Sequence, residues 1–121
     1  MWGDHVLLMT AKGAKSGELI TTPLVCGREN NNYIVVASKG GAPTHPMWFG
    51  NLKANPEVEV EVAKTDGSGT ETFKARARVV EDRKERDRLF ADMCGIWPSY
   101  ADYQTRTERV IPVIILERLQ E

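Results

Sequence analysis

The most constraining feature of this sequence is a two-residue alternation between positions 57 and 79. Glutamate alternates with valine over 57–62, and apolar residues alternate with lysine or arginine over 73–79. Successive side chains of a strand point to opposite faces, so both segments are predicted strands with one buried and one solvated face. Joined through the turn at 65–69, they form a hairpin that sets three glutamates against three cations. We interpret these charges as a solvated face and not as a site.

Composition narrows the class of protein. The 121 residues are predicted to form a single domain, 1–121, and 16 basic against 17 acidic residues give a net charge of -1, which argues against a dedicated nucleic-acid binder. The longest apolar runs have four or five residues, too few to span a bilayer, and we expect no signal peptide before them. We expect a cytoplasmic protein. We also expect that a natural N-terminal segment is missing from this sequence and that this segment could contact a membrane. Cys26 and Cys94 are predicted to be two buried thiols in a reducing cytosol.

The remaining pattern predicts a mainly β protein. Further extended segments are expected over 5–12, 19–28, 33–37 and 107–119, where Pro112 either confines the strand to an edge or marks its start. Short helices are expected after a Thr44 cap, from Asp82 to about Gly95, and from a Ser99–Asp102 capping box. About six strands in hairpins without βαβ repetition favour a closed or half-closed antiparallel barrel with peripheral helices.

One stretch, 38–52, has the character of a ligand site. An apolar strand over 33–37 leads into Ser38-Lys39-Gly40-Gly41, and a helix with Pro46 in its first turn follows. Paired glycines permit unusual backbone dihedrals and close approach of another molecule. A strand, a glycine turn with a lysine and a helix N-terminus suit an anionic ligand. The alternative is a tight turn with a solvated lysine.

A second lysine loop, Lys15-Ser16-Gly17, lies between the first two extended segments. It lacks the spacing of a Walker phosphate loop. As an anion site it needs a second group facing it, for which Lys39 is the candidate, and otherwise it is a plain hairpin turn.

The sequence offers few catalytic groups of its own. His5 and His45 have no partner at metal-ligand spacing, and neither a nucleophile elbow nor a Ser/His/Asp triad is present. An enzyme of this kind needs a bound cofactor. A stripe of Met47, Trp48 and Asn51 could face its flat ring, and Trp97, Tyr100 and Tyr103 could form a lid whose tyrosines donate a proton. Each of these residues could equally be core or surface.

Several of these motifs together resemble one family. The sequence is similar to deazaflavin-dependent nitroreductases of actinobacteria, a resemblance that covers about 5–117. It is carried by Lys15-Ser16-Gly17, Thr21-Thr22-Pro23-Leu24, Ser38-Lys39-Gly40-Gly41, His45-Pro46-x-Trp48, Asn51-Leu52, Tyr100-Ala101-Asp102-Tyr103-Gln104, Thr107, Arg109, Ile111 and Pro112. The resemblance implies a split β-barrel of the FMN-binding type and the deazaflavin coenzyme F-420.

The resemblance also implies a set of site residues. Coenzyme contacts are expected from Lys15, Ser16 and Lys39 at the phosphate, and around the ring from Pro23, Ser38, Gly40, Gly41, Met47, Trp48 and Asn51. Gly17, Val36 and Ala37 are expected as further coenzyme-binding residues. Substrate contacts are expected from Trp97, Tyr100 and Tyr103, and catalytic roles from Tyr103, Tyr100 and Ser38. No metal is expected. Family members reduce quinones, activated enones such as coumarin-type lactones, and nitroaromatics.

The sequence departs from the family pattern at three positions. Ala14 and Ile20 stand where arginines are common, so a weaker grip on the phosphate is expected. Trp97 replaces a tyrosine, which removes one hydroxyl from the substrate side. The expected function is hydride transfer from reduced F-420 to a small electron-poor acceptor, by a monomer or a homodimer. The alternatives are an FMN-binding oxidoreductase of the same fold and a non-catalytic deazaflavin carrier.

Overall fold

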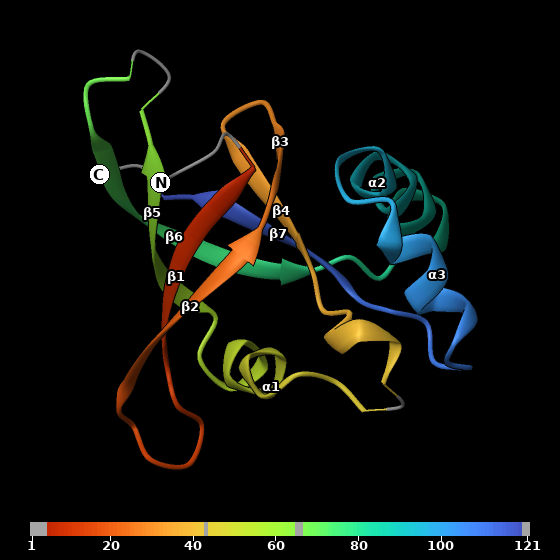
Figure 1. The fold of residues 1–121 in the computed structure, drawn as a ribbon. Helices are drawn as coiled ribbons and strands as arrows, with labels where there is room; N and C mark the ends of the chain where they lie inside the picture. The colour runs from red at the N-terminus through yellow and green to blue at the C-terminus, as the bar shows by residue number, and fades with distance from the viewer. Residues whose placement is uncertain (1–4, 43, 65–66, 120–121) are drawn as a thin grey trace.

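A computed structural model describes residues 5–42, 44–64 and 67–119. Most of its elements are strands, and short helices lie between some of them (Figure 1). They are β1 (Val6–Lys12), β2 (Leu19–Val25), β3 (Gly27–Glu29), β4 (Asn32–Val36), the 3-10 turn η1 (Lys39–Gly41), α1 (Met47–Ala54), β5 (Glu57–Ala63), β6 (Thr70–Val79), α2 (Arg83–Ile96), α3 (Ser99–Thr105) and β7 (Val113–Arg118).

The strands form one antiparallel sheet in the order β2-β1-β5-β6-β7-β4-β3. The two edge strands, β2 and β3, are consecutive in the chain and are separated only by Cys26, whose N–H donates to the carbonyl of His5 over 2.8 Å. Opposite edges of the sheet therefore meet at Cys26, and the sheet curls into a half-closed barrel (Figure 1). This confirms the predicted mainly β fold with peripheral helices.

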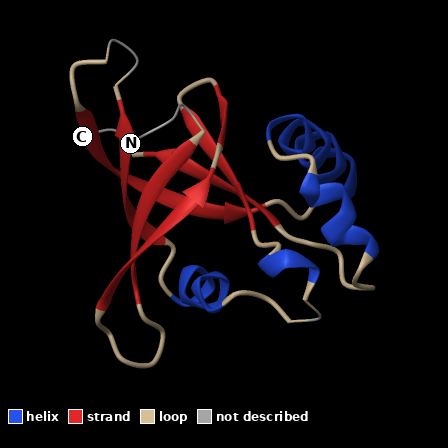
Figure 2. Cartoon of the chain, in the orientation of Figure 1, coloured by secondary structure: helices blue, strands red, loops and turns tan. Residues whose placement is uncertain are grey.

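Apolar residues gather in two clusters, one on each side of the central strands. The cluster inside the barrel takes the alternating residues of β1 and β5, whereas the second lies between β4, β7 and the helices α2 and α3. Figure 2 shows these helices beside the sheet. The inner cluster includes Leu7, Met9, Val35, Val58, Val60 and Leu116, and the outer one Ile34, Val36, Leu89, Met93, Val113 and Ile115. Residues 33–36 of β4 and 113–116 of β7 are buried on both faces of the sheet, so these stretches are continuous apolar runs without alternation.

The charged hairpin is confirmed with one change of partner. Glu57 lies opposite Arg76 and Glu59 opposite Lys74, but Glu61 lies opposite Thr72. Arg78 instead lies opposite Ile115 of β7 and approaches Glu85 and Glu117, at 3.5 Å in both cases. The outer face therefore carries two of the three predicted cross-strand charge pairs. Part of the predicted turn at 65–69 falls outside the described residues.

Two strand boundaries differ from the predictions. The segment 19–28 is not one strand, because Cys26 divides it between opposite edges of the sheet. The strand expected over 107–119 begins only at Val113. Pro112 thus marks its start, and β7 runs inside the sheet between β6 and β4.

Capping is predicted correctly for one helix and wrongly for two. The carboxylate of Asp82 accepts from the N–H of Glu85 over 3.2 Å at the start of α2, as expected. In α1 and α3 the residue at the N-cap is a proline, Pro46 or Pro98, and no side chain caps either helix. Neither Thr44 nor Ser99 therefore has the expected role. Helix α2 continues through Gly95 to Ile96.

Both cysteines are free thiols, as the sequence predicted. Cys26 is buried at the join between β2 and β3, and burial raises its pKa to about 11. Cys94 is half-buried on α2.

Candidate functional site

The turn after β4 holds an unusual backbone. Lys39, Gly40 and Gly41 have φ angles of 46°, 64° and 82°, all in the left-handed region. A Cβ at Gly41 would lie 2.6 Å from the carbonyl oxygen of Tyr103, so α3 itself occupies the space that this glycine leaves. A Cβ at Gly40 would meet nothing within 4 Å. Gly40 and Lys39 are therefore the members of the turn that face open space.

Arg109 holds this turn from a distant part of the chain. Its guanidinium donates to the carbonyls of Ser38 over 2.7 Å, Ala42 over 2.8 Å and Ala37 over 3.2 Å. A fourth contact, of 3.0 Å, joins it to Nδ1 of His45. Arginine is always a donor, so Nδ1 of His45 must be the acceptor and the ring unprotonated there. Desolvation, Arg109 and Lys53 lower the pKa of His45 accordingly.

Lys39 itself has a local partner. Its ammonium donates to the hydroxyl of Thr44 over 3.2 Å, and the residue is exposed. The hydroxyl expected to cap α1 thus contacts the lysine of the turn. A neutral, exposed partner leaves the positive charge of Lys39 uncompensated among the described residues.

The second lysine loop is tied to α1. The carboxamide oxygen of Asn51 accepts from the N–H of Ala14 over 3.0 Å, and the carboxamide nitrogen of Asn55 donates to the carbonyl of Lys12 over 3.3 Å. Within the loop, the hydroxyl of Ser16 accepts from the N–H of Glu18 over 3.1 Å. Asn51 and Ser16 therefore shape the loop, while Lys15 is exposed and has no ion pair with a described residue.

The predicted stripe on α1 spans very different environments. Met47 is 85% exposed, whereas Trp48 is half-buried against the inner cluster and Leu52 is buried. The predicted stripe therefore does not form a single exposed surface. Met47 and Trp48 are the members that can meet a ligand.

The three aromatic residues near α3 are also unlike one another. Tyr100 is only 5% exposed and packs in the outer cluster, and burial raises its pKa to about 12. Tyr103 is half-buried at the edge of that cluster, its ring 6.1 Å from that of Tyr100 and edge-on. Trp97 is 46% exposed at the end of α2. Tyr100 is thus part of the core, and Tyr103 is the tyrosine beside the glycine turn.

Other expected coenzyme residues take backbone or surface positions. The side chains of Val36 and Ala37 are buried, so these residues can face a ligand only through their main chain. Ser38 is half-buried in the turn and its carbonyl binds Arg109. Pro23 is exposed on β2, and Gly17 has a φ of 73° in the lysine loop.

The structure thus assembles two parts of the predicted site. The Ser38–Gly41 turn contacts α3 through Gly41 and Tyr103, and the Lys15 loop contacts α1 through Asn51. Sequence reasoning cited Arg109 and Gln104 only within the resemblance and gave neither a role. Long-range hydrogen bonds to main-chain carbonyls leave no periodic signal in a sequence.

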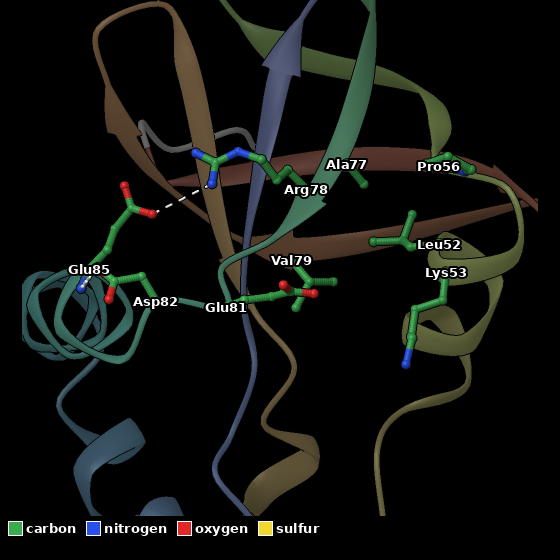
Figure 3. Close-up of a pocket in the computed structure, with 9 residues that line it drawn as sticks. All are labelled: Leu52, Lys53, Pro56, Ala77, Arg78, Val79, Glu81, Asp82 and Glu85. Atoms are coloured by element: carbon green, nitrogen blue, oxygen red, sulfur yellow. Dashed lines mark hydrogen bonds and ion pairs between the residues drawn. The ribbon is translucent and has the colours of Figure 1, made fainter.

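A separate cavity of about 520 Å³ lies between α1, the end of β6 and the start of α2 (Figure 3). Its floor is apolar and its rim carries three carboxylates and two cations. It is lined by Leu52, Lys53, Pro56, Ala77, Arg78, Val79, Glu81, Asp82 and Glu85, none of them an expected site residue. The carboxylates disfavour an anionic ligand, so we do not assign a phosphate-bearing coenzyme to this cavity.

In the described part of the chain, no group of His, Cys, Asp or Glu side chains has metal-binding geometry. Within the same residues, no helix has the length and apolar character that crossing a bilayer requires.

The fold and the site define a split-barrel protein with a cationic glycine turn beside a tyrosine helix. A family model described as F420H(2)-dependent quinone reductase matches residues 1–118. An F420H(2)-dependent quinone reductase of Mycobacterium tuberculosis is 38% identical over 120 residues, covering 93% of this chain and 72% of that protein. The chain belongs to the F420H(2)-dependent quinone reductase family, which confirms the resemblance to deazaflavin-dependent reductases.

Solved structures agree with this assignment. One described as an F420-H2 dependent reductase (FDR-A) has a TM-score of 0.80 and 40% identity, and the match covers 93% of this chain and 94% of that one. Another, described as a domain-swapped dimer, has a TM-score of 0.80 and 42% identity, and the match covers 93% and 80% of the two chains. The haem storage protein HutZ of Vibrio cholerae, at 17% identity and a TM-score of 0.74, shares the fold alone over 98% of this chain and 84% of its own.

Proposed function

We propose that this protein binds coenzyme F-420 and catalyses reduction of a quinone-type acceptor by the reduced coenzyme. Membership of the reductase family supports the reaction class. The observation that carries the site assignment is the Lys39-Gly40 pair, in which an uncompensated ammonium adjoins a left-handed glycine with open space above it. Such a turn admits a phosphate close to the main chain and offers it a cation.

The donor set fits an anionic, flat coenzyme. Lys39 and Lys15 are exposed cations on two anchored loops, and they would hold the phosphate and the acidic tail. Trp48 and Met47 at the start of α1 offer apolar surface to a ring. Activated enones and nitro compounds are further acceptors that we propose for the same chemistry.

When bound, reduced F-420 supplies the hydride, and the protein supplies position and a proton. The turn and the lysine loop hold the anionic groups, and the helix α3 places Tyr103 beside the turn. The hydroxyl of Tyr103 donates a hydrogen bond or a proton to the acceptor oxygen. Tyr100 supports the ring of Tyr103 from the core, and its raised pKa keeps its hydroxyl protonated. Ser38 is proposed to face the coenzyme from the turn, and Trp97 to border the acceptor.

Purified protein mixed with reduced F-420 and menadione tests this function. We expect reoxidation of the coenzyme faster than in the protein-free mixture. Tyr103→Phe is expected to lower kcat more than coenzyme binding, because only the proton donor is lost. No rate above the control with menadione, a coumarin-type lactone and a nitroaromatic would falsify the proposal.

Parallel titrations with F-420 and FMN separate the two coenzymes, and tight F-420 binding without turnover would indicate a carrier.

We propose a small-molecule acceptor, a cytoplasmic location with peripheral membrane contact, and a monomer or homodimer as the working unit. A structural relative is described as a domain-swapped dimer, which supports the dimer as one of the two proposed states. Light scattering of the purified chain measures its mass, and co-sedimentation with anionic lipid vesicles measures membrane contact. A mass larger than that of a dimer would contradict the proposed oligomeric state. Protein that stays wholly in the supernatant would contradict the proposed membrane contact.

A further inference from the structure

Arg109 has more polar partners than any local role requires. It lies in the segment between α3 and β7, yet all four partners of its guanidinium belong to residues 37–45. Three are main-chain carbonyls, of Ala37, Ser38 and Ala42. Four of the five guanidinium N–H groups are thereby directed at protein acceptors. Arg109 is thus not free to bind an anion directly.

The turn needs such a partner. Lys39 is held at a φ of 46°, which costs a residue with a side chain about 1–2 kcal/mol. Inside the turn, two backbone hydrogen bonds between described residues oppose this strain, from Gly41 to Ser38 over 3.0 Å and from Ala42 to Lys39 over 3.1 Å. The three carbonyls that converge on Arg109 would repel one another without a cation between them. A planar guanidinium can serve all three, which a lysine ammonium cannot do with the same geometry.

The main chain of Arg109 is fixed in turn by α3. The carboxamide of Gln104 donates to the carbonyl of Arg109 over 2.8 Å, and its oxygen accepts from the N–H of Ile111 over 3.0 Å. Gln104 follows Tyr103 in the helix. The chain of contacts therefore runs from the tyrosine helix through Gln104 and Arg109 to the turn that carries Lys39.

We propose that Arg109 is a positioning residue for the coenzyme, which fixes Lys39 and Gly40 in their orientation and sets their place relative to Tyr103. It acts through the turn and does not touch the coenzyme. The inference rests on the proposed function for the identity of the ligand, but its link to the turn is independent of any ligand.

Three variants test the inference. Arg109→Gln removes the planar cation, Arg109→Lys keeps the charge with poorer geometry, and Arg106→Gln is the matched control. Arg106 is exposed and its Cβ lies 3.0 Å from the Cβ position built at Gly41, so its loss removes one charge from the same neighbourhood. The measurements are amide hydrogen exchange of Gly41 and Ala42 without coenzyme, and F-420 affinity by fluorescence titration.

We expect Arg109→Gln to speed exchange of both amides at least tenfold and to weaken F-420 binding at least tenfold. Arg109→Lys should fall between this variant and the natural protein, and added methylguanidinium should restore part of the affinity of Arg109→Gln. Arg106→Gln should change either quantity less than threefold. If Arg109→Gln does not fold, the intermediate values of Arg109→Lys support the inference, and values equal to those of the natural protein overturn it.

Two other results overturn the inference. Unchanged exchange and affinity in folded Arg109→Gln would show that the turn holds itself. Equal losses in Arg106→Gln and Arg109→Gln would show a charge effect without positioning. Failure of the natural protein to bind F-420 overturns the proposed function, and the positioning role with it, whereas binding that Arg109→Gln does not alter overturns the positioning role alone.

Discussion

Lys39 combines backbone strain with an exposed positive charge. A left-handed lysine is costly where glycine would serve, so a lysine in this conformation favours a role for the ammonium. Replacement Lys39→Ala is expected to weaken F-420 binding by about 1–3 kcal/mol, which is the range of a charge-assisted hydrogen bond. Fluorescence titration measures the loss. Lys84→Ala, an exposed lysine on α2, is the control, and equal affinity in all three proteins would make Lys39 a solvated turn residue.

His45 gives the turn a dependence on pH. Its folded-state pKa lies below the ordinary 6.5, so the unfolded chain binds the proton more readily. The contribution of neutral His45 to stability is therefore complete above pH 6.5 and is lost as pH falls through the depressed pKa. Denaturant unfolding of the natural protein and of His45→Asn across pH 4–8 measures it. Asparagine keeps an acceptor toward Arg109 without titrating.

We expect the natural protein to lose more stability than His45→Asn as the solution is acidified below pH 6.5. His5→Asn, at the exposed second histidine, is the control and should follow the natural protein. Parallel curves for the natural protein and His45→Asn would contradict the assigned contact between His45 and Arg109.

Residue types in the site were easier to predict than their partners. The sequence pointed to Lys39, the glycine pair and the tyrosines, because turn chemistry and helical spacing are local signals. The sequence assigned no role to Arg109. Its partners are main-chain carbonyls, which every residue has, so the residue types around it give no signal. The prediction that Thr44 caps α1 was wrong, because the hydroxyl of Thr44 instead accepts from the Lys39 ammonium.

At the scale of elements, helix α1 holds the hairpin loop that carries Lys15. The contact from Ala14 N–H to Asn51 is its anchor near the lysine. Asn51→Ala should raise exchange of the Ala14 amide and cost about 1 kcal/mol of stability, as for one net hydrogen bond. It should also weaken F-420 binding, because Lys15 then has no fixed position. Asn55→Ala, which releases only the contact to Lys12, is the control. It should leave the affinity for F-420 unchanged.

Elements with strict alternation were predicted well, and those that depend on the closure of the sheet were not. The β5–β6 hairpin follows from two-residue periodicity, and the apolar strand β4 from its composition. The division of 19–28 at Cys26 was missed, because the chain passes between sheet edges without any glycine or proline at that residue. The third charge pair was misassigned because register depends on the turn.

At the scale of the whole molecule, Arg86 joins α2 to α3 and to the segment that leads into β7. Its side chain is 7% exposed and donates twice to the carbonyl of Ile111, over 3.1 and 2.8 Å, and once to Gln104 over 2.8 Å. Arg86→Met would leave a buried carbonyl unpaired, at a cost of about 2–4 kcal/mol. We expect the Tm to fall by roughly 10 °C.

Thermal unfolding followed by circular dichroism checks this value. Arg83→Met removes an exposed ion pair with Asp87 and should leave the Tm nearly unchanged. A similar small shift for Arg86→Met would show that water replaces the lost donors and that the helices are attached by apolar contacts alone.

The proposed function requires that the glycine turn hold an anionic coenzyme with its ring beside Tyr103. A crystal structure of the protein with bound F-420 tests it most directly. We expect the phosphate within 4 Å of the Lys39 ammonium and against the Gly40 main chain, with the deazaflavin between α1 and α3. A coenzyme seated in the cavity beside Glu81 and Asp82, with Lys39 still bound to Thr44, would contradict it.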